Sequence, residues 1–249
     1  MHPDRALVIV PTYNERDNMP ALLDSLLASP LCLDVLVVDD GSPDGTADLV
    51  DEHSGSSGRC VVMRRRGRRG LGRSYVDGYR WALAAGYPRV VQMDADLSHN
   101  PDYIPALLSA SQEADVVLGS RYCRGGGVRD WPWRRVLLSR FANLYVGAVA
   151  GLPVRDATSG FRCYTRGALE RIQIDRVASN GYAFQVEMTY RAQQAGLLLA
   201  ECPIVFTDRR AGRSKISRAV LVESMVVPWR LRLGLSAAPA RPSPERPAA

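Results

Sequence analysis

Short apolar runs alternate with longer amphipathic segments along the first half of this chain. The runs are rich in β-branched residues, which favours strands, and the segments between them have the length and periodicity of helices. Strands that alternate with helices are typical of a mainly parallel sheet covered by helices on both faces. The sequence therefore predicts an α/β fold, with strands at residues 6–10, 34–40, 60–64, 89–94 and 114–120.

The regular alternation ends near residue 122. A glycine-rich stretch and then an amphipathic helix occupy residues 123–151, and a further strand is predicted at 197–208. Residues 216–235 have the pattern of a helix that is broken or kinked near Pro228, because proline cannot donate to the helical ladder. The pattern in the second half of the chain therefore predicts one more strand and two helices. Both helices carry apolar and basic residues.

The size of the chain fits one domain. Of its 249 residues, 46% are hydrophobic, which is enough to bury a substantial core. We expect a single domain at residues 1–235, which ends in the helix at 216–235. Residues 236–249 are rich in proline and alanine with little to bury, and we predict that they form a disordered tail.

The chain is basic, and its positive charge comes almost wholly from arginine. The formal net charge of +6 results from 32 basic and 26 acidic residues, and Lys215 is the only lysine. The base composition of the source genome explains this bias most simply, but arginine also suits phosphate groups and anionic membranes. Nucleic acid is not expected as a partner, because the arginines lie mostly in strand-end loops beside acidic residues.

Cysteine usage and the N-terminal residues indicate where the protein works. The five cysteines are widely spaced and form no C-x-x-C pair, which favours a reducing compartment. The first residues contain a strand rather than the apolar core of a signal peptide. No stretch reaches the roughly 18 apolar residues that a transmembrane helix needs. We therefore expect a peripheral protein on the cytoplasmic side of the membrane, without a signal peptide or a transmembrane helix.

Polar residues follow the predicted strands at the edge where parallel sheets place their ligand sites. Asp39 and Asp40 end one strand, and Asp94 and Asp96 follow another. We favour Asp40 as a binding residue, because a carboxylate at that point can accept a hydrogen bond from a sugar hydroxyl or from an N–H of a base. The sequence GRRGLG at 67–72 lacks the ending of a P-loop, so we interpret it as a basic loop near phosphate.

Asp94 and Asp96 are one residue apart, and like charges at that spacing repel. A D-x-D sequence is most often a pair of solvated loop acids. At a ligand crevice, however, a divalent cation would remove the repulsion, and Mg²⁺ and Mn²⁺ bridge carboxylates to substrate phosphates. Because the chain has no Cys/His cluster for zinc, the position of the pair predicts Mg²⁺ or Mn²⁺.

Eight motifs connect the chain with a known family. In order, they are IVPTYNE, VVDDGSPDGT, GLGRSYVDGYRWA, QMDADLSHNPD, VLGSRY, TSGFRCY, GYAFQVEM and FTDRRAGRSK. With them the chain resembles, over residues 5–218, the dolichol-phosphate and polyprenol-phosphate mannosyltransferases, which are family 2 glycosyltransferases of the GT-A fold. The resemblance implies a metal-dependent transfer of mannose from GDP-mannose to a polyprenyl phosphate, with inversion of the anomeric centre.

The resemblance also implies which residues bind the donor. The pocket for guanine and ribose would be lined by Pro11, Tyr13 and Glu15 and completed by Val38 and Asp40. Asp94, Ala95 and Asp96 would surround the diphosphate and the mannose, and Asp96 would bind the metal directly. Ser98 stands where many relatives have a glutamine that assists at the metal. Because a hydroxyl is a weaker ligand, either Ser98 binds the metal less tightly or water fills that place.

Basic residues complete the site that the resemblance implies. Arg209 and Lys215 would close over the donor, and Arg121 would meet phosphate. The acceptor phosphate would be held by Arg121, Arg135 and Ser139. The residues expected to carry catalysis are Asp96, Arg121 and Lys215.

The stretch at 129–143, RDWPWRRVLLSRFAN, has two interpretations. Its large apolar residues fit an ordinary core, but tryptophan beside arginine is also typical of a membrane interface. These residues are Trp131, Trp133, Leu137, Leu138 and Phe141. We expect contact with a membrane surface through the helix at 216–235, or through a membrane subunit.

Three other functions stay open at this point. A transferase of the same fold that uses UDP-glucose or UDP-GlcNAc with a polyprenyl phosphate would share most of the motifs. A basic nucleic-acid-binding protein is disfavoured by the distribution of the arginines. A structural scaffold is the third alternative, and metal-dependent sugar transfer or hydrolysis would exclude it.

Overall fold

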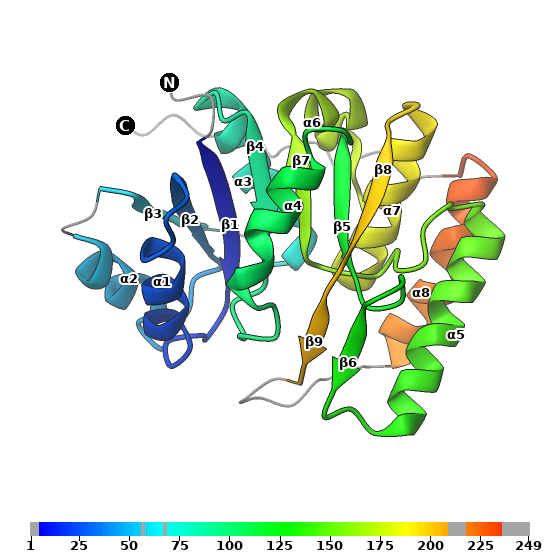
Figure 1. Ribbon diagram of the computed structural model, residues 1–249, viewed down its shortest axis with the longest axis horizontal. Coiled ribbons are helices and arrows are strands. Elements are labelled where there is room, and N and C mark those ends of the chain that lie inside the picture. Colours follow the sequence, from blue (N-terminus) through cyan, green and yellow to red (C-terminus); the bar gives the residue numbers. More distant parts are fainter. Residues whose placement is uncertain (1–4, 56–57, 67–68, 209–217, 236–249) are drawn as a thin grey trace.

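The computed structural model describes residues 5–55, 58–66, 69–208 and 218–235, and Figure 1 presents its ribbon. In this part of the chain, seven strands form one sheet in the order β3-β2-β1-β4-β7-β5-β8. All neighbouring strands are parallel except that β7 is antiparallel to both β4 and β5. The predicted α/β fold with a mainly parallel sheet is therefore confirmed. The strands are β1 (Ala6–Thr12), β2 (Leu33–Asp39), β3 (Cys60–Arg64), β4 (Arg89–Gln92), β5 (Val116–Ser120), β7 (Arg162–Thr165) and β8 (Leu199–Pro203).

Helices cover both faces of the sheet, because each central strand has apolar residues on both sides. In β1, Leu7 and Ile9 face one hydrophobic core, whereas Val8 and Val10 face the other. The first core is closed by α3 (Leu71–Ala84), α5 (Trp133–Ala150), α6 (Arg166–Ile172), α7 (Gly181–Gln194) and α8 (Arg218–Arg232). The second is closed by α1 (Met19–Leu27), α2 (Thr46–Ser54) and α4 (Ile104–Ala110).

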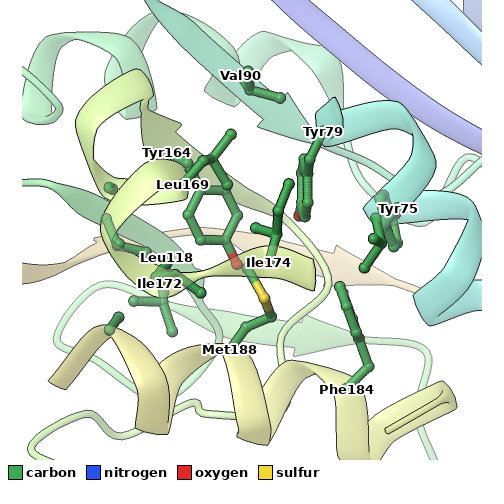
Figure 2. Packing of buried hydrophobic residues seen from close by; sticks show 14 of the residues in the cluster. Tyr75, Tyr79, Val90, Leu118, Tyr164, Leu169, Ile172, Ile174, Phe184 and Met188 are labelled. Carbon is green, nitrogen blue, oxygen red and sulfur yellow. The ribbon is translucent and has the colours of Figure 1, made fainter. Parts of the chain in front are cut away.

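Aromatic packing fixes α3 against the sheet and against α7 (Figure 2). The ring of Tyr75 stacks on Phe184, with centroids 5.7 Å apart, and the ring of Tyr79 meets Tyr164 edge-on at 5.5 Å. Gly78 allows the close approach, because a Cβ at that position would lie 2.8 Å from Cγ2 of Ile9. This packing places the N-terminal end of α3 beside the carboxyl ends of β1 and β2.

Several segments differ from the prediction, and α6 and α7 were not predicted at all. The strand expected at 197–208 is divided at Ile204 into β8 and β9 (Val205–Thr207), and β9 pairs with β6 (Gly127–Arg129) in a separate parallel ribbon. The sequence pattern did not reveal β7, since it is four residues long and contains an arginine. Pro228 lies inside α8, which continues past it to Arg232, so of the expected break or kink the break is wrong. The predicted tail at 236–249 lies outside the described residues.

Candidate functional site

A pocket of about 230 Å³ opens at the carboxyl ends of β1, β2 and β4, beside the first turn of α3. Parallel sheets commonly bind ligands at this edge. Seven of the ten residues that line the pocket were predicted to bind the donor: Pro11, Tyr13, Glu15, Asp40, Asp94, Ala95 and Asp96. The other three, which the sequence analysis did not select, are Thr12, Leu71 and Ser74. The structure thus brings residues from three separate strand ends into one cavity.

The neighbouring acids Asp39 and Asp40 have different surroundings. Asp39 is only 2% exposed, and its carboxylate accepts hydrogen bonds from Thr12 Oγ1 and from the backbone N–H groups of Gly41 and Ser42. It therefore holds the turn that follows β2. Asp40 is the member of the pair that lines the pocket.

Asp40 is held by contacts from the loop before α3. Its Oδ1 meets the guanidinium of Arg65, and its Oδ2 accepts the backbone N–H of Gly70 at 2.9 Å. Arg65 also donates to Asp77 at 2.8 Å and to Ser74 Oγ at 3.1 Å. Because these contacts fix both carboxylate oxygens, Asp40 reaches the pocket with a set orientation. Gly70 belongs to the GRRGLG loop, so this loop contributes to the site through its backbone.

Tyr13 and Glu15 line the pocket from the turn that follows β1. Tyr13 is 42% exposed, and the guanidinium carbon of Arg69 lies 4.1 Å from the centre of its ring. The phenol oxygen of Tyr13 also accepts a hydrogen bond from Arg69 Nη1. The carboxylate of Glu15 accepts from Asn18 Nδ2 at 2.8 Å. An exposed aromatic ring with a cation over it offers a flat wall to a planar ligand.

Asp94 is oriented by two buried side chains. Tyr75 Oη donates to Asp94 Oδ1 at 3.1 Å, and the backbone N–H of Asp94 donates to His99 Nδ1 at 3.2 Å. Burial, followed by the charge of Asp94, raises the pKa of Tyr75 well above its usual value, so this phenol keeps its proton. Burial lowers the pKa of His99 despite the nearby carboxylates of Asp94 and Asp96, which act in the opposite direction.

Asp96 is 7% exposed and is supported by the turn that follows it. Its Oδ1 accepts from the backbone N–H of Ser98 at 3.1 Å and from the Ser98 hydroxyl. Leu97 takes a φ of +60°, which closes this turn tightly. Ser98 itself is 2% exposed and does not line the pocket. Its hydroxyl therefore orients the carboxylate that was predicted to bind the metal.

The two carboxylates fit a magnesium or manganese ion that is shared with a substrate. Within the described residues, no group of three or more His, Cys, Asp or Glu residues could hold a metal alone. Asp94 and Asp96 nevertheless line one pocket, and Mg²⁺ is typically bound by one or two carboxylates together with waters and substrate phosphates. The donor set is made of hard oxygen atoms, which suits these ions.

Arg121 lies away from the pocket wall in a buried ion pair. Its Nε and Nη2 each donate to the Asp156 carboxylate at 2.7 Å, and Nη2 also donates to Thr158 Oγ1 at 2.9 Å. The side chain is only 8% exposed, and the partner is fully buried. The arginine that was predicted to meet phosphate is therefore already paired with a carboxylate. Asp156 stands in a loop between helix and strand, and no pattern in the sequence marked it.

Arg135 and Ser139, the other predicted acceptor residues, connect to the same region through α5. Arg135 Nη1 lies 2.9 Å from each oxygen of Asp208, and its guanidinium stacks on Trp131 at 3.9 Å. The guanidinium of Arg121 lies 5.6 Å from the same indole ring. Trp131 is therefore contacted by both arginines.

Ser139 is connected to Arg121 by hydrogen bonds. Asn143 Nδ2 donates to the carbonyl of Ser139 and to Thr158 Oγ1, at 3.0 Å in each case. Thr158 Oγ1 in turn accepts from Arg121. The three predicted acceptor residues thus belong to one connected region, although they come from a strand end and a helix.

Among the residues that the structure describes, the predicted donor residue Val38 is not in the pocket wall. Val38 is fully buried in the core, where its Cγ2 lies 3.4 Å from the position of a Cβ on Gly78. Arg209 and Lys215 lie outside the described residues.

The outer faces of α5 and α8 expose large apolar side chains, and the two helices lie side by side (Figure 1). Trp229 Nε1 donates to Tyr145 Oη, which donates to the carbonyl of Met225. We call the exposed set the α5–α8 apolar surface: Trp133, Leu137, Leu138, Phe141, Leu144, Met225, Val226, Trp229, Leu233 and Leu235.

The exposure of these side chains tests the core interpretation of the stretch at 129–143. Of the five residues named there, Trp131 alone is half-buried, against Phe206. Trp133, Leu137, Leu138 and Phe141 are between 53% and 69% exposed, so they are not core residues. In the part of the chain that the structure describes, no helix combines the length and the apolar character needed to cross a bilayer.

Comparison with known proteins adds sequence relatives. Residues 7–173 match the family model described as glycosyl transferase family 2. The polyprenol monophosphomannose synthase of Mycolicibacterium smegmatis is 45% identical over 232 residues, which cover 92% of this chain and 88% of that protein. The undecaprenyl-phosphate mannosyltransferase of Micrococcus luteus is 42% identical over 222 residues, with coverage of 89% and 91%.

Solved structures extend the comparison at the level of the fold. Glucosyl-3-phosphoglycerate synthase from Mycobacterium tuberculosis, in complex with Mn²⁺, UDP and glucosyl-3-phosphoglycerate, superposes with a TM-score of 0.65 at 20% identity. The match covers 93% of this chain and 80% of that one. The same enzyme with Mg²⁺ and UDP gives a TM-score of 0.64 at 19% identity. The predicted GT-A fold is thereby confirmed.

Proposed function

The chain belongs to glycosyl transferase family 2, and from this premise we propose that it transfers mannose from GDP-mannose to a polyprenyl phosphate. One observation carries the proposal. Two relatives named for the mannosylation of polyprenyl phosphates align with this chain at 45% and 42% identity, and this chain has a pocket lined by acidic residues at its strand ends. The reaction is a single displacement that inverts the anomeric centre and yields a polyprenyl β-mannosyl phosphate.

The pocket supplies the donor half of the reaction. Tyr13 and Glu15, together with Pro11, bind the base and the ribose, and Asp40 accepts a hydrogen bond from the base. The support for Asp40 is its fixed orientation between Arg65 and the Gly70 backbone. Val38 stabilises this wall from the core behind it.

Asp94 and Asp96, with Ala95 between them, face the diphosphate and the mannose. Asp96 would hold a Mg²⁺ or Mn²⁺ ion, and Ser98 orients its carboxylate. Such an ion neutralises charge on the departing diphosphate. Asp94 binds the sugar side of the donor, where the Tyr75 hydroxyl fixes its Oδ1.

The acceptor half requires no strong general base, because a phosphate monoester is already anionic at neutral pH. Positioning and charge neutralisation then carry the reaction. Arg135 and Ser139 align the acceptor phosphate for in-line attack, and Arg121 supports them through its buried pair with Asp156. To bind it, Arg135 exchanges Asp208 for phosphate, which is feasible because that ion pair is about one-third exposed. We assign Arg209 and Lys215 to the departing GDP.

The α5–α8 apolar surface binds the cytoplasmic face of a membrane. Bands of Trp, Phe and Leu with arginine beside them favour the boundary between headgroups and acyl chains. Arg134 and Arg140 are exposed on α5 among these apolar residues and complement anionic headgroups. A membrane-docked α5 would bring Arg135 and Ser139 close to the phosphate of a lipid acceptor.

A transfer assay tests the proposed reaction. The purified protein is incubated with short-chain polyprenyl phosphate and radiolabelled GDP-mannose, UDP-glucose or UDP-GlcNAc, with and without EDTA. We expect a lipid-extractable product from GDP-mannose alone, and its loss in EDTA. A product from a UDP-sugar instead would replace the donor assignment. Absence of product from all three donors, with saturating Mg²⁺ or Mn²⁺, would refute the proposal.

A further inference from the structure

The sheet changes its hydrogen bonding at the point where β4 leads into the pocket. In the antiparallel pairing of β4 with β7, Gln92 lies opposite Arg162. The same register, continued by two residues, sets Asp94 opposite Gly160. Since β7 begins at Arg162, the backbone N–H of Asp94 has no strand partner there and donates to His99 Nδ1 at 3.2 Å. An imidazole therefore takes the position of a strand carbonyl.

His99 is held in that place by tight packing. Its side chain is 1% exposed, its ring stacks on Phe161 with centroids 5.1 Å apart, and it meets Phe206 edge-on at 5.4 Å. A Cβ on Gly160 would lie 3.2 Å from Asp94 Oδ2 and 3.3 Å from His99 Cε1. Glycine at this position thus leaves room for both side chains.

The direction of the hydrogen bond defines the state of the ring. Because Nδ1 accepts the amide hydrogen, the ring proton resides on Nε2. The Tyr75 hydroxyl lies 3.1 Å from Asp94 Oδ1 and 3.2 Å from the Met93 carbonyl, and His99 Nδ1 lies 3.8 Å from Asp94 Oδ2. The turn after β4 and helix α3 therefore hold Asp94 jointly, and His99 is the residue that accepts its backbone N–H.

We propose that His99 is a positioning residue, which sets the orientation of Asp94 toward the bound donor by accepting its backbone N–H. This role rests on the proposed function in so far as Asp94 faces the sugar side of the donor. Without the acceptor, the peptide between Met93 and Asp94 loses the contact of its N–H but keeps the contact of its carbonyl with the Tyr75 hydroxyl at 3.2 Å. This peptide can then tilt about the remaining contact, and the carboxylates of Asp94 and Asp96 lose their mutual geometry. Displacement of a positioned group by about 1 Å costs on the order of 100-fold in rate.

Three substitutions test the hydrogen-bond acceptor of His99 separately from the packing of its ring. His99→Phe keeps a stacked ring and removes the acceptor, His99→Asn keeps an acceptor near the position of Nδ1, and His99→Gln moves it toward the position of Nε2. We expect His99→Phe and His99→Gln to lower kcat by about 10- to 100-fold, whereas His99→Asn restores most of the rate. Melting temperatures measured on the same samples detect a merely structural loss.

Hydrogen exchange gives a readout that does not depend on sugar transfer. By mass spectrometry of the peptide that spans residues 90–98, His99→Phe should accelerate amide exchange at Asp94, and His99→Asn should restore protection. If the wild type transfers no mannose, the proposed function fails, while exchange and Mn²⁺-dependent GDP binding still test His99. Unchanged exchange in His99→Phe, or kcat losses in all three variants that follow their melting temperatures, would overturn the inference. Should His99→Phe not fold, the comparison of His99→Asn with His99→Gln decides.

Discussion

The donor side and the acceptor side of this site handle charge in opposite ways. On the donor side, Asp94 and Asp96 open into the pocket, and the contacts that fix them come from Tyr75, His99 and Ser98. On the acceptor side, the cations Arg121 and Arg135 are each paired with a carboxylate of the same chain. The donor side thus presents negative charge to a cation, whereas the acceptor side keeps its positive charge neutralised.

The two acceptor arginines differ between themselves in burial. The pair of Arg121 with Asp156 is almost fully buried. A phosphate could therefore bind the Arg121 guanidinium only by displacing a desolvated carboxylate. The pair of Arg135 with Asp208 is about one-third exposed on both sides and can open at low cost. The difference implies that Arg135 is the arginine that moves to phosphate, and that Arg121 maintains the shape of the acceptor region.

The largest effect is expected on the donor side, from Asp96→Ala. Loss of the carboxylate removes the proposed metal ligand, and we expect kcat to fall by about 1,000-fold, or about 4 kcal/mol in the activation free energy. Steady-state transfer at saturating Mn²⁺ measures it. Ser98→Ala is the matched variant, since it removes only the hydroxyl that supports Asp96 and should cost about tenfold. Activity of Asp96→Ala near that of the wild type would refute the metal assignment.

The next effect distinguishes the two carboxylates on the acceptor side. Asp156→Asn leaves Arg121 as a buried charge without its counter-ion, and we expect a loss of about 3–5 kcal/mol in the free energy of unfolding. Asp208→Asn breaks an exposed pair and should cost less than about 1 kcal/mol. Urea unfolding of the two variants makes the comparison. Equal losses would contradict the distinction between a structural and a mobile arginine.

The sequence allowed more of the donor side to be predicted than of the acceptor side, for a physical reason. The donor residues follow parallel strands whose apolar pattern is plain, and parallel strands bring their carboxyl ends to one edge. Seven predicted residues therefore line one pocket. The partners on the acceptor side, Asp156 and Asp208, come from loops far apart in the sequence, and no periodicity marks them. Likewise, β7 was missed because its buried Arg162 breaks the apolar pattern.

An intermediate effect concerns the membrane. Replacing Leu137, Phe141 and Leu144 by serine removes three exposed apolar side chains from the α5–α8 apolar surface. We expect flotation with vesicles of anionic lipid to fall by about tenfold, because each exposed side chain contributes on the order of 1 kcal/mol or less at an interface. Transfer to a short, water-soluble acceptor should stay unchanged.

A matched control separates this surface from general hydrophobicity. Leu198 is 64% exposed before β8, outside the surface, so Leu198→Ser should float like the wild type. Equal flotation of the triple variant and the Leu198→Ser control would refute the surface as the contact. Flotation that requires a co-expressed membrane protein would assign the surface to a membrane subunit instead.

The smallest effect tests how far the donor side is preformed. Arg69 stacks on Tyr13 at the pocket rim, and an exposed cation–π contact stabilises a geometry by about 0.5–1 kcal/mol. If the stack holds the Tyr13 ring ready for the base, Arg69→Ala should raise the KM for GDP-mannose by about two- to fivefold and leave kcat unchanged. Arg134→Ala is the matched control, because Arg134 stacks on Trp133 at 5.5 Å, outside the pocket, and should leave this KM unchanged. A lower KM in Arg69→Ala would mean that Arg69 competes with the base for the face of the Tyr13 ring. The Tyr13 ring would then have to lose its contact with Arg69 before the donor binds, just as Arg135 has to leave Asp208 before it binds the acceptor phosphate.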